Sequence, residues 1–354
     1  MNGHTTPNRL LLVSVPRTAS NLLLKILNIP DQPDTITSDR GGYFFHAAFV
    51  SAAKDGRLTQ PPRDWTDEAK RNVQSTFQQC FDRLEECCVR AESEQKLIFA
   101  KEHSFWFSNP MEFSQVVHGA EHGPYDLSSF RVNVPSRYGP TQTFSSNNKT
   151  VFPDEYLRTW RMVFIIRHPA LVFPSFFRAM DRISDTELFE PGTLPGTLAA
   201  NMTLRWTRWL FEWCQEQSGT APMLLDAYDV IHRPLVVRRF CELAGLDPTK
   251  MMFEWERTAN GDSDPHCPGY EAARQNGVVE EHMAIWEKSM KIMTSTLDGS
   301  EGVMKEKEPG VVDIVEEAKK WRVEFGDRMA GVVEKAVWDA MPDYEYLQAQ
   351  RFTI

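Results

Sequence analysis

The sequence predicts an α/β protein built on a doubly wound, mainly parallel sheet that is flanked by helices. Four short runs of Leu, Ile, Val and Phe do not alternate with polar residues, as expected of strands covered on both faces. Helical patterns separate these runs, and strand–helix alternation is typical of doubly wound sheets. The four expected strands are residues 9–15, 96–100, 161–166 and 222–227.

The intervening segments predict helices. Apolar residues recur at three- and four-residue steps within 66–93 and within 197–217, which indicates amphipathic helices. A further helix is expected within 228–248, where Gly245 and a following proline mark its end. Helices are therefore expected between the first and second strands, between the third and fourth, and after the fourth.

The remaining segments set the domain organisation. We expect one α/β domain over residues 1–294, an exposed linker over 295–310, and C-terminal helices over 311–354 that pack on the same domain. Residues 104–154 break the strand–helix rhythm with scattered prolines and glycines. Insertions of this length are often lids or binding loops, so we expect this one to cover a substrate pocket.

Composition limits the function classes. The chain has 354 residues and a formal net charge of −10, which argues against a nucleic-acid surface but not against a small anionic ligand in a locally positive cleft. No signal-peptide layout and no apolar stretch of about 18 residues are found, so we expect a cytoplasmic protein that does not contact membranes. The six cysteines lack paired C-x-x-C spacing and are expected to be reduced.

The first candidate site is "PRTAS", residues 16–20, between an expected strand and an expected helix. A strand that turns sharply into a helix leaves backbone N–H groups unpaired, and the helix dipole adds positive potential there. Small residues, two hydroxyls and Arg17 suit a phosphate or sulfate. The alternative is an ordinary turn capped by Thr18 or Ser20, with Arg17 in solvent. The stretch is not a Walker A loop.

Two further candidate sites follow other strands. In "KEH", Lys101 and His103 follow the expected strand 96–100 and lie on the same side of the chain, where His103 could accept a proton near a cation. In "RHPALVFPS", Arg167 ends a strand and Ser175 follows eight residues later, so both could hold one phosphate. The alternatives are a solvated strand end, a salt bridge and an ordinary helix residue.

The order of these motifs resembles the sulfotransferases that use 3′-phosphoadenosine-5′-phosphosulfate (PAPS), over roughly residues 9–250. That family has a strand–loop–helix P-[KR]-[ST]-[GA]-[ST] for the 5′-phosphosulfate, a K-T-H motif with the catalytic base, and an Arg followed by Ser for the 3′-phosphate. Tyr228, in "AYDVIHRPLVVRRFCELAGLDP", matches a family tyrosine. The stretch "FPDEYLRTWRMVFIIRHPALVFPS" is similar to fungal sulfotransferase-like proteins of secondary metabolism.

The resemblance implies transfer of a sulfuryl group from PAPS to a hydroxyl of a small molecule, a phenol or an alcohol, with 3′,5′-bisphosphoadenosine (PAP) as product and no metal. It implies His103 as general base, with Lys101 and Arg17 stabilising the charge that develops. The residues expected to hold the nucleotide are Arg17, Thr18, Ala19, Ser20, Asn21, Arg167, Ser175 and Tyr228.

The chain departs from the family pattern in three places. Arg17 replaces the usual lysine, and Leu22 replaces a tryptophan that often stacks on adenine. The late R-K-G-x-x-G motif is absent, with Arg274 and Gly277 as a weak substitute.

The acceptor pocket is expected to draw on the insertion and on neighbouring aromatic residues in "HSFWF" and "RGGYFFHAAF". Apolar pockets with few polar groups suit phenols and hydroxylated polyketides or terpenoids, although aromatic residues are more often part of a core. The expected pocket residues are Phe44, Phe45, His46, Phe105 and Trp106.

Other functions remain open. Sulfation could drive an elimination or a cyclisation, or the chain could be a non-catalytic nucleotide-binding descendant. A kinase or NTPase would need a Walker lysine and a carboxylate for Mg²⁺, and neither is found in that arrangement. His266, Cys267 and His282 fit no common metal spacing. Whether the protein forms a homodimer is left open.

Overall fold

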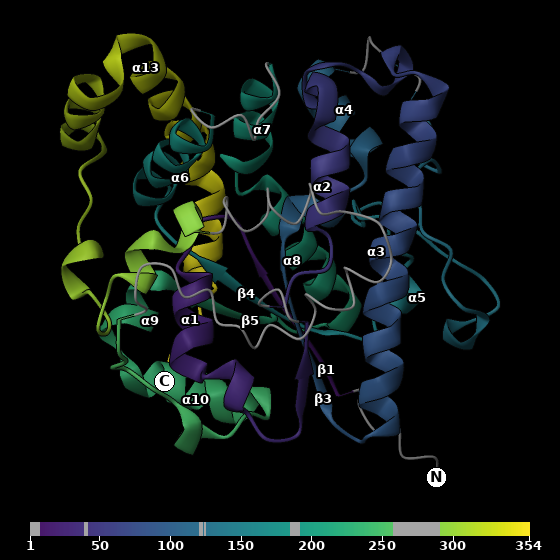
Figure 1. Ribbon diagram of the computed structural model, residues 1–354, viewed down its shortest axis with the longest axis horizontal. Helices are drawn as coiled ribbons and strands as arrows, with labels where there is room; N and C mark the ends of the chain where they lie inside the picture. Colours follow the sequence, from purple (N-terminus) through teal and green to yellow (C-terminus); the bar gives the residue numbers. More distant parts are fainter. Residues whose placement is uncertain (1–7, 39–41, 120–122, 124, 185–191, 258–290) are drawn as a thin grey trace.

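The computed structural model describes residues 8–38, 42–119, 123, 125–184, 192–257 and 291–354. Its centre is a five-stranded sheet in the order β2-β3-β1-β4-β5, in which every pair of neighbours is parallel (Figure 1). The strands are β1 Arg9–Ser14, β2 Thr35–Thr37, β3 Leu97–His103, β4 Arg161–Ile166 and β5 Met223–Asp226. The predicted α/β class with a doubly wound parallel sheet is confirmed. The three-residue strand β2 was not predicted, because so short a strand carries little pattern.

Both faces of the sheet are covered, which explains the continuous apolar runs. Leu10 and Leu12 of β1 belong to one core, together with residues of α1 (Ser20–Leu27), α9 (Ala227–His232) and α10 (Pro234–Ala244). Leu11 and Val13 alternate with them and belong to the larger core on the opposite face. In the strand register Leu12 pairs with Lys101, and Ser14 with His103, so all four of these side chains point to the α1 face.

The larger core lies under helices from widely separated parts of the chain (Figure 1). They are α2 His46–Ala53, α3 Asp67–Ser93, α4 Pro110–His118, α5 Asp154–Leu157, α6 Pro169–Ser184, α7 Thr193–Asn201, α8 Arg205–Ser218 and α13 Ile314–Ala349. Helix α13 is kinked at Gly326, where φ is +73°, and packs on α6 and α8. Short 3-10 turns include η2 Lys54–Thr59, η4 Ser104–Phe107 and η8 Lys305–Lys307.

Several expected boundaries differ from those observed. The helix expected over 197–217 is two helices, α7 and α8, and the one expected within 228–248 is broken into α9 and α10. The second break lies at Arg233, directly before Pro234, because the residue before a proline is disfavoured in the helical conformation.

Most of the described residues of the insertion 104–154, which is expected to be a lid, do not line the cavity. Phe130, Val132 and Phe152 are buried in the larger core, and Trp106 is the one residue of the described part of this insertion that lines the cavity described below. Apolar side chains spaced irregularly among prolines still bury their surface when α3 and α8 lie beside them.

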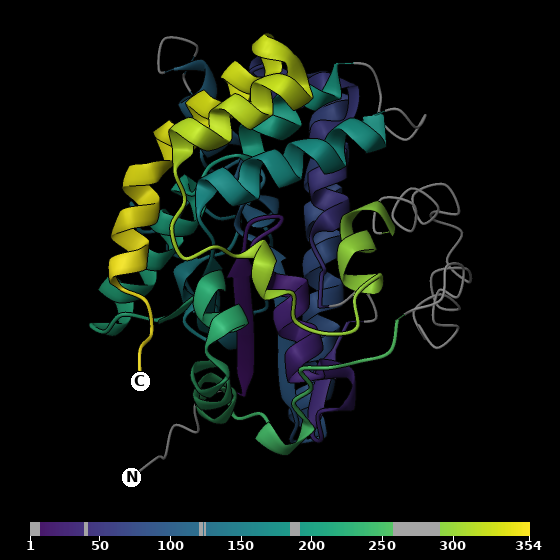
Figure 2. The same cartoon turned by 90° about the vertical axis from the view of Figure 1, so that its left-hand side faces the viewer.

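The segment 295–310, expected to be an exposed linker, is mostly exposed or half-buried. Ser300 and Glu308 within it are buried, and residues 291–298 are helical. Figure 2 shows this yellow-green segment beside the N-terminal end of α1. Among the described helices, none is both long and apolar enough to cross a membrane. The described cysteines are all free thiols: Cys80, Cys87, Cys88, Cys214 and Cys241.

Candidate active site

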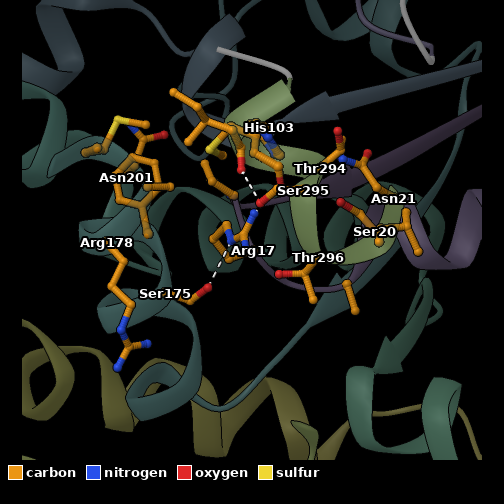
Figure 3. A pocket seen from close by; sticks show the side chains of 18 of the residues that line it. Arg17, Ser20, Asn21, His103, Ser175, Arg178, Asn201, Thr294, Ser295 and Thr296 are labelled. Carbon is orange, nitrogen blue, oxygen red and sulfur yellow. Dashed lines mark hydrogen bonds between the residues drawn. The ribbon is translucent and has the colours of Figure 1, made fainter. Parts of the chain in front are cut away.

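A cavity of about 620 Å³ lies where β1, β3 and β4 end. Residues from all three sequence motifs line it: Arg17 and Ser20 from the first, with the adjacent Asn21, His103 from the second, and Arg167 with Ser175 from the third. Figure 3 shows Arg17 beside Ser175, with Ser20 and Asn21 on one side and His103 above them. The topology therefore brings together groups that are up to 158 residues apart in the sequence.

The β1–α1 turn is shaped by two residues in the left-handed region, Arg17 with φ +73° and Ala19 with φ +62°. These conformations are uncommon for residues other than glycine, and they persist where the surrounding structure fixes them. Helix α1 has no side-chain cap, so the N–H groups of its first turn remain available to an anion. The turn therefore has the form expected of an anion site.

Arg17 is mostly buried in this cavity. Its Nε donates to Ser175 Oγ at 2.9 Å, and its Nη1 donates to the carbonyl oxygen of Met293. Burial, followed by repulsion from Arg167, Arg182 and Arg178, lowers the pKa of Arg17 to about 10. These arginines repel one another, and an anion bound among them would reduce that repulsion.

Lys101 lies behind the turn and is fully buried. Its Nζ donates to Asn21 Oδ1 and lies 4.5 Å from the centre of the Tyr43 ring. Burial lowers the pKa of Lys101 to about 7, against an opposing effect of Glu102. Glu102 points to the other face, accepts from the amides of Phe44 and Phe45 at 2.5 and 3.0 Å, and has its pKa raised by burial to about 8.

His103 has a partner on each ring nitrogen. Nδ1 lies 2.9 Å from Ser14 Oγ, and Nε2 lies 3.0 Å from the hydroxyl of Tyr43. Ser14 donates its own proton to the carbonyl oxygen of Glu102, so it accepts from Nδ1–H. Nε2 is then the unprotonated nitrogen. Burial, followed by the charge of Lys101 and by His46, lowers the pKa of His103 well below 6.5, which keeps the ring neutral at pH 7.

The third motif is arranged differently from the expectation. Ser175 is expected to hold a phosphate together with Arg167. In the structure its hydroxyl oxygen accepts a hydrogen bond from Arg17. Arg167 donates from Nε to Glu308 at 2.6 Å and from Nη2 to the carbonyl oxygen of Lys307 at 2.8 Å. Burial raises the pKa of Glu308. A buried carboxylate therefore stands beside the arginine that the resemblance assigns to a phosphate.

The remaining expected site residues divide into two groups. His46 and Trp106 line the cavity. The residues outside the cavity are Thr18, whose hydroxyl donates to Val15 O at 2.9 Å, Tyr228, whose ring lies 4.5 Å from that of His232, and the core residues Phe44, Phe45 and Phe105. Arg274 and the three residues rejected as metal ligands, His266, Cys267 and His282, lie outside the described residues. Among the described residues, no three acidic, histidine or cysteine side chains gather as metal ligands would.

Two walls of the cavity lie outside the three sequence motifs. One is the segment from Ile292 to Leu297, whose Thr294, Ser295 and Thr296 lie near Asn21 and Ser20 (Figure 3). The other is α7, through Thr193, Thr197 and Asn201. The spacing of four residues in α7 predicts that its three polar side chains share a helix face. The segment from Ile292 to Leu297 has no comparable sequence pattern.

Comparisons with known proteins identify the family. No family model matches the chain. Sulfotransferase ppzF of Metarhizium rileyi is 33% identical over 363 residues, which cover 99% of this chain and 98% of that protein. Sulfotransferase ppzF of Metarhizium majus is 34% identical over 359 residues, which cover 98% and 97%.

Among solved structures, a sulfotransferase domain from the curacin biosynthetic pathway covers 67% of this chain and 74% of its own, at 13% identity and a TM-score of 0.30. We conclude nothing from so distant a likeness. The two Metarhizium relatives match nearly the whole length at identities that define a family, and the chain therefore belongs to the sulfotransferase family.

Proposed function

We propose that this sulfotransferase takes its sulfuryl group from PAPS and transfers it to a hydroxyl of a small aromatic or aliphatic alcohol. The observation that carries the proposal is the meeting of Arg17, His103 and Arg167 in one cavity at the N-terminal end of α1. This arrangement offers cations and unpaired amides for a phosphosulfate, and a neutral base for a hydroxyl.

The residues of the turn fit an anionic donor. The first-turn amides of α1 and the guanidinium of Arg17 would hold the 5′-phosphosulfate, and Lys101 would add a positive charge through its contact with Asn21. Arg167 and Ser175 are the candidates for the 3′-phosphate, which would compete with Glu308 for Arg167. PAPS itself supplies the sulfuryl group, while fixed donors stabilise the charge on the oxygens of the leaving group.

His103 is suited to remove the proton of the acceptor hydroxyl. Its Nε2 carries the lone pair, and Ser14 fixes the ring by accepting from Nδ1–H. In the structure the Tyr43 hydroxyl is hydrogen-bonded to Nε2. The acceptor hydroxyl would either displace the Tyr43 hydroxyl from Nε2 or transfer its proton to Nε2 through Tyr43. His103 takes up the acceptor proton as the new O–S bond forms and the S–O bond to PAP breaks.

A transfer assay with sulfur-35-labelled PAPS and a panel of phenols and alcohols tests this function. The wild type is expected to form a labelled product together with PAP, and His103→Ala to lower the rate by about 10²–10⁴. His118→Ala, at the end of α4 and away from the cavity, is the matched control and should leave the rate unchanged. Transfer by His103→Ala at the wild-type rate would remove His103 from the mechanism.

A further inference from the structure

One face of α7 presents polar atoms to the cavity. Thr193, Thr197 and Asn201 lie at steps of four residues, so they share that face, and all three line the cavity. They are only 5%, 1% and 3% exposed. Their side-chain oxygens Oγ1, Oγ1 and Oδ1 have no hydrogen-bond partner in the part of the chain that the structure describes. Buried polar atoms of this kind are rare in folded proteins and call for a ligand or a bound water.

The orientation of Asn201 is fixed by its other end. Its Nδ2 donates to the carbonyl oxygen of Thr197 at 2.9 Å, which only a nitrogen can do. The free atom is therefore Oδ1, an acceptor that only an N–H or O–H group can satisfy. The two threonine hydroxyls can donate or accept, so they adapt to either kind of ligand atom.

Unpartnered hydrogen-bond donors come from two other elements that line the cavity. The indole Nε1 groups of Trp106 and Trp321 are buried and have no acceptor among the described residues, and both side chains line the cavity. An indole N–H only donates. The ring of Trp106 lies 4.5 Å from that of His103 and nearly perpendicular to it, so this polar region begins beside the proposed base.

Close packing holds α7 in place. A Cβ atom added at Gly196 would lie 2.6 Å from the Cβ of Leu58 in η2, so the glycine lets the two segments approach. Between the polar groups the cavity walls are apolar, with Phe49 from α2 and Met180 and Ile183 from α6. Figure 3 shows Asn201 at the end of the cavity away from Ser20 and Asn21, beyond Arg17 and Ser175.

We propose that the α7 face is an acceptor subsite that selects an aromatic alcohol bearing a second polar group, with an N–H donor beside a carbonyl oxygen, as in an amide or a lactam. The N–H would satisfy Asn201 Oδ1, and the carbonyl would accept from a threonine hydroxyl or an indole N–H. The apolar walls take the flat ring, and the hydroxyl faces His103. This inference rests on the proposed function and adds the substrate class.

Three probes of similar shape test the subsite by isothermal titration calorimetry on the full chain with PAP present. They are 2-naphthol, which has only the reacting hydroxyl, 6-hydroxy-2-quinolinone, which adds a lactam, and its N-methyl derivative, which keeps the carbonyl but loses the N–H. We expect the lactam to bind about tenfold more tightly than either other probe, since buried polar atoms that stay unpaired penalise the other two.

Two variants assign that preference to α7. Asn201→Leu and the nearly isosteric Thr197→Val should each reduce the lactam preference to about threefold or less, because the lactam loses a partner and 2-naphthol no longer leaves that polar atom unpaired. Thermal unfolding shows whether each variant is folded, and Thr197→Val retains the shape if Asn201→Leu does not fold. Equal binding of the three probes, binding of none of them, or a preference unchanged in both variants would overturn the subsite.

The same titrations separate this inference from the proposed function. PAP is titrated first without any probe. If PAP binds and the three probes do not differ, the donor site stands and the α7 subsite is wrong. If PAP does not bind but the lactam preference is present and depends on Asn201 and Thr197, the subsite stands and the PAPS proposal fails.

Discussion

Lys101 gives the most quantitative prediction, because its charge should change when an anion binds. Its buried amino group has a pKa of about 7, so at pH 8 this group is neutral in about 0.9 of the molecules. An anionic donor in the adjacent turn favours the charged form and should return the proton. Glu102, with a pKa of about 8, is half ionised there and can release up to about 0.5 proton as Lys101 becomes charged.

Binding of PAP at pH 8 should therefore take up between about 0.4 and 0.9 proton. The phosphates of PAP have a second pKa of about 6 and are already ionised at pH 8, so they add little. Calorimetric titrations in two buffers with different ionisation enthalpies measure the uptake directly. Lys101→Met keeps the length of the side chain without a titratable group, and its uptake should fall close to zero. Its affinity for PAP should fall by about 10–100-fold.

Glu102→Gln completes the design, because it removes the group that gives up a proton. Its uptake should rise toward about 0.9. Zero uptake in the wild type, or the same uptake in Lys101→Met as in the wild type, would refute the reasoning about the buried lysine.

Three further predictions concern other elements of the site. Glu308→Gln removes a carboxylate that competes for Arg167 and should tighten PAP binding by about tenfold in a low-salt titration, whereas unchanged or weaker binding would show that Glu308 does not compete. Ser14→Ala should lower kcat by about tenfold with little change in the acceptor KM, because it removes the hydrogen bond that orients the His103 ring but does not contact the acceptor. A change in KM alone in steady-state kinetics would contradict this role. Gly196→Ala should destabilise the fold by about 1–3 kcal/mol because its Cβ meets Leu58, measured by thermal unfolding against Gly331→Ala, which has open space around it; equal melting temperatures would argue against the close packing of α7.

The parallel sheet could be predicted because its strands are continuous apolar runs and its neighbours are helices. The meeting of the three motifs could be predicted for the same reason, since parallel strands end at one edge and place Arg17, His103 and Arg167 there. Alternation also predicted that Lys101 and His103 share a face, and the register with β1 shows that they do.

The cover of the cavity could not be predicted, because it depends on contacts between distant segments. The pairing of Arg167 with Glu308 joins residues 141 positions apart, and nothing near Glu308 in the sequence indicates it. The sequence of residues 295–310 favours a linker, since it lacks an apolar stripe, yet Ser295, Thr296 and Leu297 line the cavity. The aromatic residues Phe44 and Phe45 face the core because the backbone amides of both bind the inward-pointing Glu102.

A crystal structure of the protein grown with PAP tests the central claim most directly. We predict the 5′-phosphate on the first-turn amides of α1 within hydrogen-bond distance of Arg17, the 3′-phosphate beside Arg167 and Ser175, and His103 open to the remaining part of the cavity. PAP bound on another surface, or a 5′-phosphate that does not touch the turn between β1 and α1, would contradict it.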